Sequence, residues 1–157
     1  MNRQEILQTL KERFPEDVTG VFEKSAKRVY VEIKPSAIVE MAQFIFKEIG
    51  ARFIIASGVD ARNHMEILYH FAEEDIDLVI SLRVHLPKTK LEIDSLTPVF
   101  TAAQWIEREM HELLGINFLG HPELKPLLLP EDWPEGVYPL RKDYKEWDPN
   151  AIRDRGV

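Results

Sequence analysis

The sequence of 157 residues contains no cysteine. Without thiols the chain forms no disulfide, and it supplies no thiolate to an iron–sulfur cluster or a cysteine-ligated zinc site. No apolar run approaches the roughly 20 residues that a membrane-spanning helix needs, and the first residues lead directly into a helical pattern without an apolar signal region. We therefore expect a chain that carries no iron–sulfur cluster and contacts a membrane only through a partner.

Clustered positive charge and glycine-rich loops are also lacking. The chain has 20 Lys and Arg residues against 27 Asp and Glu residues, which gives a formal net charge of −7. Sequence-independent binding of nucleic acid requires clustered basic side chains, and here acidic residues are interspersed among the basic ones. Gly20 and Gly58 stand alone, so no phosphate-binding loop is present. We expect neither nucleic acid nor a nucleotide as a partner.

What the sequence does contain is the pattern of one α+β domain. Residues 64–73 alternate Met65, Ile67, Tyr69 and Phe71 with more polar positions, which is typical of a strand with one covered face. Thr101 and Gln104 fit a helical capping box. The expected helices cover residues 2–14, 35–49 and 102–114, and the expected strands cover residues 18–22, 28–33, 52–57, 64–73 and 77–86. This order predicts an antiparallel or mixed sheet with helices packed on one face.

The composition changes after Gly115. Residues 116–157 contain six of the chain's 10 prolines, which exclude a long helix or a central strand. They also contain many leucines and aromatic residues, which favour burial over disorder. We therefore divide the chain into an α+β domain, 1–115, and an irregular proline-rich extension, 116–157. A partner-binding extension is favoured over one that docks on its own domain, and both remain open.

Residues around this boundary carry a resemblance to a known family. The motifs, in chain order, are Glu107-Arg108-Glu109, Gly115-Ile116 with Phe118, Gly120-His121-Pro122, Leu128-Leu129-Pro130-Glu131-Asp132-Trp133 and Pro139-Leu140-Arg141-Lys142-Asp143-Tyr144. Their order and spacing resemble the respiratory complex I 30 kDa family, including the equivalent subunit of membrane-bound energy-converting [NiFe] hydrogenases. Glu112, Leu114, Pro126 and the long loop 134–138 depart from the usual complex I pattern and favour the hydrogenase side of the family.

The resemblance implies a non-catalytic, cofactor-free subunit of the peripheral arm of a membrane-bound redox complex. Its partners would be a large [NiFe]-hydrogenase-like (49 kDa-type) subunit and a small iron–sulfur subunit, on the cytoplasmic side of the cell membrane. The electron donor and acceptor stay unassigned.

Twelve residues of the motifs form the predicted interface. Arg141 and Tyr144 are of types that are enriched at binding hot spots. The twelve residues are Glu107, Arg108, Glu109, Phe118, His121, Pro122, Leu128, Trp133, Leu140, Arg141, Asp143 and Tyr144. For the three charged residues at 107–109, the competing interpretation is an ordinary solvated face of the helix.

The five histidines suggest a rival interpretation, a stand-alone His-centred metal-dependent hydrolase. His111-Glu112 begins an H-E-x-x-H pattern, but Gly115 occupies the position of the second histidine. We therefore predict a surface His–Glu pair, with Glu107 and His111 forming a weak contact one helical turn apart. His121 is expected to shape its loop by bonding backbone groups rather than to act as a base.

His64, His70 and His85 are predicted to be ordinary sheet-surface residues. We predict no catalytic residue, no metal site and no cofactor. A small adaptor that uses the same module is the third alternative.

Overall fold

The computed structural model describes residues 1–145 of the chain. Trp147, one of the apolar residues of the proline-rich extension, lies outside this range. The elements are α1 (Arg3–Arg13), β1 (Val18–Ser25), β2 (Arg28–Ile33), η1 (Pro35–Ala37), α2 (Ile38–Gln43), η2 (Phe44–Ile49), β3 (Arg52–Asp60), β4 (His64–Glu73), η3 (Glu74–Ile76), β5 (Leu78–Pro87), β6 (Glu92–Asp94), α3 (Ala103–Leu114) and β7 (Asn117–Leu119).

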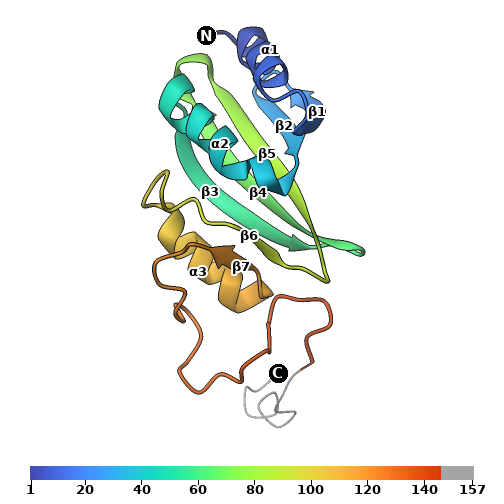
Figure 1. Cartoon of the computed structure of the whole chain (residues 1–157), viewed down its shortest axis with the longest axis vertical. Coiled ribbons are helices and arrows are strands. Elements are labelled where there is room, and N and C mark those ends of the chain that lie inside the picture. Colours follow the sequence, from blue (N-terminus) through green and yellow to red (C-terminus); the bar gives the residue numbers. More distant parts are fainter. Residues whose placement is uncertain (146–157) are drawn as a thin grey trace, which may run out of the picture.

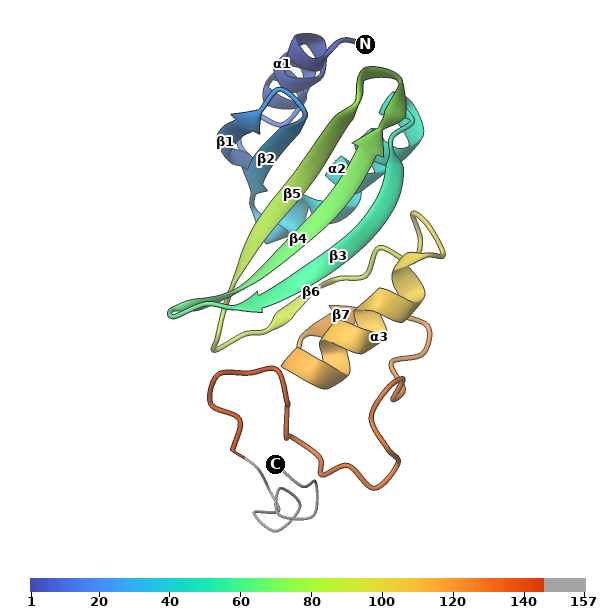
Figure 2. The same ribbon diagram turned by 180° about the vertical axis from the view of Figure 1, so that it is seen from behind.

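Five strands form one mixed sheet in the order β1-β2-β5-β4-β3. The neighbours β1/β2, β5/β4 and β4/β3 are antiparallel, and β2 and β5 are parallel. Figure 1 shows α1 and α2 lying against one face of this sheet, and Figure 2 shows the opposite face from behind, with the strands in front of both helices. The structure confirms the predicted α+β fold with helices on one face.

The core lies between this sheet and its helices because the period-two pattern of the strands points one side chain in two toward them. Met65, Ile67, Tyr69 and Phe71 of β4 are all buried, as are the alternate residues of β5. Helix α1 adds Ile6, Leu7 and Leu10 to the same cluster. The opposite face carries the polar residues of the same strands.

Helix ends differ from the expected ones in two places. The capping box predicted at Thr101 and Gln104 is wrong, because α3 begins after Ala102 and has no side-chain cap. A complete capping box occurs instead at α1, where the Asn2 side chain accepts from the Glu5 backbone at 3.0 Å and Glu5 accepts from the Asn2 backbone at 2.7 Å. The segment 35–49, expected as one helix, passes from a 3₁₀ turn through α2 to a π-helical end at Gly50.

A second, two-stranded parallel sheet was not predicted. It pairs β6 with β7, and Ile93 lies opposite Phe118. Three-residue strands are too short to show an alternating pattern, so sequence periodicity could not reveal them. Ile116 and Phe118 are buried in the same core as the large sheet. The packed unit therefore continues past Gly115 into the start of the proline-rich extension.

Candidate partner-binding surface

Helix α3 lies beside the edge strand β3 (Figures 1 and 2) and carries the first motif, Glu107-Arg108-Glu109. Gly58 of β3 makes this close approach possible, since a Cβ at that position would collide with the Leu114 side chain and touch Met110. Another face of α3 is turned toward the proline-rich extension, and Trp105 is exposed to solvent. The described part of that extension, residues 116–145, folds back along the helix through side-chain and backbone hydrogen bonds.

Glu107 faces the core rather than solvent. Its side chain is 0% exposed, and it accepts hydrogen bonds from the Ser95 hydroxyl (2.6 Å) and the Leu96 backbone N–H (2.7 Å). Burial raises the pKa of its carboxyl to about 7, although both hydrogen bonds act to lower it. This corrects two expectations, that Glu107 lies on a solvated face of the helix and that it pairs with His111. The Nδ1 atom of His111 instead lies 2.8 Å from the Ile116 carbonyl oxygen.

Glu112 is also buried, which corrects its assignment as a surface residue. Its carboxylate accepts the backbone N–H groups of Leu127 (2.9 Å), Leu128 (2.6 Å) and Leu129 (3.4 Å). Three successive amides on one carboxylate form an anion-binding concavity of the kind that turns of backbone create. Glu112 therefore sets the path of the Leu127-Leu128-Leu129 segment.

Arg108 and His121 bind the first part of the extension to α3. The Arg108 guanidinium donates to the carbonyls of Lys125 (3.0 Å) and Pro126 (2.7 Å). His121 Nε2 lies 2.8 Å from the Gln104 carbonyl, and its Nδ1 accepts the Glu123 N–H at 2.9 Å. His121 thus contacts backbone groups through both ring nitrogens, as expected for a loop-shaping residue.

Arg141 closes the C-terminal end of α3. Its Nε donates to the Leu114 carbonyl at 2.6 Å, and the Leu140 N–H donates to the Leu113 carbonyl at 3.1 Å. These carbonyls have no partner within the helix, and a cation there also suits the negative end of the helix dipole. Gly115 (φ 78°) makes room, because a Cβ there would collide with Arg141 and with the Tyr138 ring over which the guanidinium lies.

The last described residues are held by β3 and by one another. The Lys142 N–H donates to Asp60 Oδ2 at 2.8 Å, and Asp60 Oδ1 is paired with Lys88 at 2.6 Å. Lys88 and the Lys142 amide lower the pKa of the Asp60 carboxyl. Trp133 and Tyr144 stack at 6.3 Å between ring centroids. These contacts order the extension without covering its outer side.

The outer side carries apolar residues. Leu128 is 63% exposed and Leu140 is 60% exposed, although both have backbone groups tied to α3. A groove of about 240 Å³ runs between β3, α3 and the extension, lined by Ile55, Glu109 and Leu140 among others. Pro122 and Asp143 are exposed, and Phe118 lies in the core. Glu107 and Phe118 are therefore unavailable to a partner, and the other ten predicted interface residues remain accessible in whole or in part.

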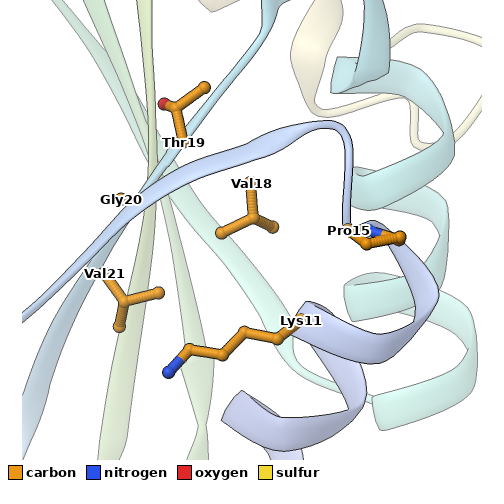
Figure 3. Close-up of a pocket in the computed structure, with 6 residues that line it drawn as sticks. All are labelled: Lys11, Pro15, Val18, Thr19, Gly20 and Val21. Atoms are coloured by element: carbon orange, nitrogen blue, oxygen red, sulfur yellow. The ribbon is translucent and has the colours of Figure 1, made fainter.

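A separate hollow of about 360 Å³ opens between α1 and β1 (Figure 3). It is lined by Lys11, Pro15, Val18, Thr19, Gly20 and Val21. Lys11 is the one titratable side chain among these six, and it reaches along the β1 residues with no carboxylate or histidine beside it in the lining.

Within residues 1–145, no helix combines the length and the apolar character that crossing a bilayer demands.

The arrangement defines a mixed α+β domain whose extended C-terminal segment is hydrogen-bonded to its last helix. Solved structures share this fold. A chain of the membrane-bound sulfane sulfur reductase, an archaeal respiratory membrane complex, superposes with a TM-score of 0.79 over 97% of this chain and 89% of its own, at 18% identity. A trypsin-resistant fragment of Nqo5 matches 79% of this chain and 100% of its own length with a TM-score of 0.66, also at 18% identity.

The chain belongs to the family described as the respiratory-chain NADH dehydrogenase 30 Kd subunit, whose model matches residues 31–149. This confirms the resemblance drawn from the motifs. A subunit of the F(420)H(2) dehydrogenase of Methanosarcina mazei is 35% identical over 98% of this chain and 99% of its own length. Membrane-bound hydrogenase subunit beta of Pyrococcus furiosus is 32% identical over 94% of this chain and 88% of its own.

Some relatives are much longer than this chain. Formate hydrogenlyase subunit 5 of Escherichia coli is 32% identical over 92% of this chain, but the match spans only 26% of that protein. The same module therefore occurs both as a chain of about this size and as a quarter of a larger polypeptide.

Proposed function

We propose that this chain is a non-catalytic subunit of a membrane-bound redox complex of the hydrogenase or complex I-like type. In this role it carries no electron-transfer group of its own. It holds a large [NiFe]-hydrogenase-like (49 kDa-type) subunit and a small iron–sulfur subunit in fixed positions on the cytoplasmic side of the membrane. We assign the docking surface to the outer side of α3 and of residues 120–145.

The exposure of Leu128 and Leu140 is the observation that carries this proposal. The backbone N–H of each residue donates a hydrogen bond to α3. Leu128 donates to the Glu112 carboxylate, and Leu140 donates to a carbonyl at the C-terminal end of the helix. A self-contained surface loop turns polar side chains outward, whereas here the polar groups bond inward and the leucines point outward. Large apolar side chains held outward on an ordered segment favour a protein partner.

The longer relatives support the identity of a large partner. In formate hydrogenlyase subunit 5, about three quarters of the polypeptide lies outside the region that matches this chain. A module that is covalently joined to a large polypeptide in one complex is a good candidate to bind a separate counterpart of that polypeptide in another. The absence of cysteine from this sequence agrees with a positional rather than an electron-carrying role.

The test is co-purification from the native host with the double substitution Leu128→Glu and Leu140→Glu. Burying one leucine contributes about 1.5–3 kcal/mol, so losing two contacts and placing two carboxylates in the interface should weaken binding at least about 100-fold. The matched control is Phe22→Glu on β1, since Phe22 is 60% exposed and lies at the far edge of the sheet.

We expect the double variant to fold with an unchanged melting temperature and to lose the large subunit, while the Phe22 variant retains it. Full recovery of the large subunit with the double variant would contradict the assigned surface. Recovery of chains that are not redox subunits would favour the adaptor alternative. Deleting the whole extension from residue 116 is a poorer test, because it removes Ile116 and Phe118 from the core.

A further inference from the structure

The uncovered face of the sheet holds a cluster of side chains that the docking role does not use. His64 and Glu66 are on β4 and His85 is on β5, with Glu66 directly opposite His85 in the strand register. His64 and Glu66 are two residues apart, so both point to the same face. Their three potential ligand atoms all lie within 4.8 Å of one another.

Two of the three distances among these atoms are close to those of a metal-binding geometry, and the shorter one is at present a hydrogen bond between Glu66 and His85. Glu66 Oε2 is 3.2 Å from His85 Nε2 and 3.6 Å from His64 Nε2. In a tetrahedral site with bonds of about 2.0–2.1 Å, two ligand atoms lie roughly 3.3–3.4 Å apart. One carboxylate oxygen therefore already sits near the edge length of such a site from each imidazole nitrogen.

The neighbouring side chains leave these three potential ligand atoms facing one another. Among the residues that the structure describes, none hydrogen-bonds the buried His64 Nε2. The two imidazole rings lie side by side, with centroids 4.0 Å apart. Arg83 approaches the other carboxylate oxygen, Glu66 Oε1, at 3.4 Å, and its guanidinium lies over the Tyr30 ring. Arg83 thus forms an ion pair with Oε1, and Oε2 faces the histidines.

We propose that His64 Nε2, Glu66 Oε2 and His85 Nε2 bind one divalent transition-metal ion, with Zn²⁺ as the best match. Two imidazoles and one carboxylate are nitrogen and oxygen ligands that Zn²⁺ accepts at tetrahedral geometry. The three side chains are half-buried at one end of adjacent strands, so an ion has access from solvent and a fourth position remains on the solvent side. The ion ties β4 to β5 and makes His64 and His85 ligands rather than ordinary surface residues.

The test is calorimetric titration of the untagged full-length chain with ZnCl₂. We expect one Zn²⁺ per chain, and we expect His64→Gln or His85→Gln to weaken binding by about 100-fold, since each removes one of three protein ligands. The matched control is His70→Gln, because His70 is on β4, faces the same side and contacts Ser81 Oγ instead of the cluster. This variant keeps the overall histidine count equal to that of the ligand variants.

A second measurement does not depend on any variant. Zn²⁺ added to the wild-type chain should shift the imidazole NMR signals of His64 and His85 and leave those of His70 unchanged. Absence of stoichiometric binding, equal loss of affinity in the His70 variant, or imidazole shifts confined to His111 and His121 would each overturn the proposal. None of these outcomes bears on the docking surface, which lies on α3 and the extension.

Discussion

The carboxyl group of Glu107 should make the stability of this protein fall as pH rises through neutrality. Glu107 is the one fully buried carboxylate among the described residues, and its two oxygens accept from Ser95 and Leu96. Ser95 Oγ also contacts Thr97 Oγ1 at 2.8 Å, so the hydroxyl can reverse its role and accept from a protonated Glu107. Both protonation states therefore keep a hydrogen bond, and the cost of charging the group in the core decides between them.

The magnitude follows from the pKa. The carboxyl has a pKa of about 7 in the folded chain against an ordinary value of 4.5. The folded state thus holds this proton more tightly than the unfolded state does. The stabilisation is complete below about pH 4.5, declines as pH rises toward 7 and is lost above it, a change of about 3 kcal/mol.

The assay is urea unfolding of the wild type and of Glu107→Gln at about pH 5 and pH 8. Glutamine keeps the shape and both hydrogen-bonding functions but does not titrate. We expect the wild type to lose about 2.5 kcal/mol relative to the glutamine variant between these two pH values, since pH 5 already lies slightly above the ordinary value. The comparison is needed because several exposed carboxyls, such as Glu48 and Asp77, have lowered pKa values and act in the opposite direction. A difference between the two proteins that does not change with pH would refute the reasoning.

Three further substitutions test the attachment of the extension and the packing of α3. Glu112→Ala leaves three backbone amides without their acceptor, and we expect faster amide exchange over residues 127–129 and a loss of about 1–3 kcal/mol in the free energy of unfolding. Arg141→Leu removes the cation from the end of α3, so proteolysis near Tyr138 should accelerate while the melting temperature stays within a few degrees; unchanged cleavage would count against a role of Arg141 in holding the extension. Gly58→Ala should cost about 1–3 kcal/mol by overpacking, and adding Leu114→Ala should recover part of the loss from the clash, measured as non-additivity in a double-mutant cycle.

Much of the fold was accessible from the sequence because β2 and most of β4 alternate between buried and partly exposed residues. The predicted limits of β2 and β4 match the structure, and Gly50 and Gly115 end their helices in the left-handed conformation. The sequence was less informative about the exact ends of helices. A Thr–Gln pair at the right spacing did not cap α3, because the helix starts one residue later than the pattern implied.

The candidate surface was harder to predict. Glu107 and Glu112 look like ordinary charges on an amphipathic helix, and both proved to be buried acceptors. Spacing along a helix shows which residues share a face, but it does not show whether a distant loop covers that face. Glu112 could have been suspected only from the Leu127-Leu128-Leu129 run, whose amides needed an acceptor somewhere nearby.

By itself the sequence determined the α+β class, the sites of most strands and helices, and the family, because these depend on periodicity and on motif order along the chain. Only the tertiary structure decided which carboxylates are buried, which leucines stay exposed, and that His64, Glu66 and His85 meet on one face. These properties arise from contacts between segments far apart in the chain, and a one-dimensional pattern does not encode the distance between them.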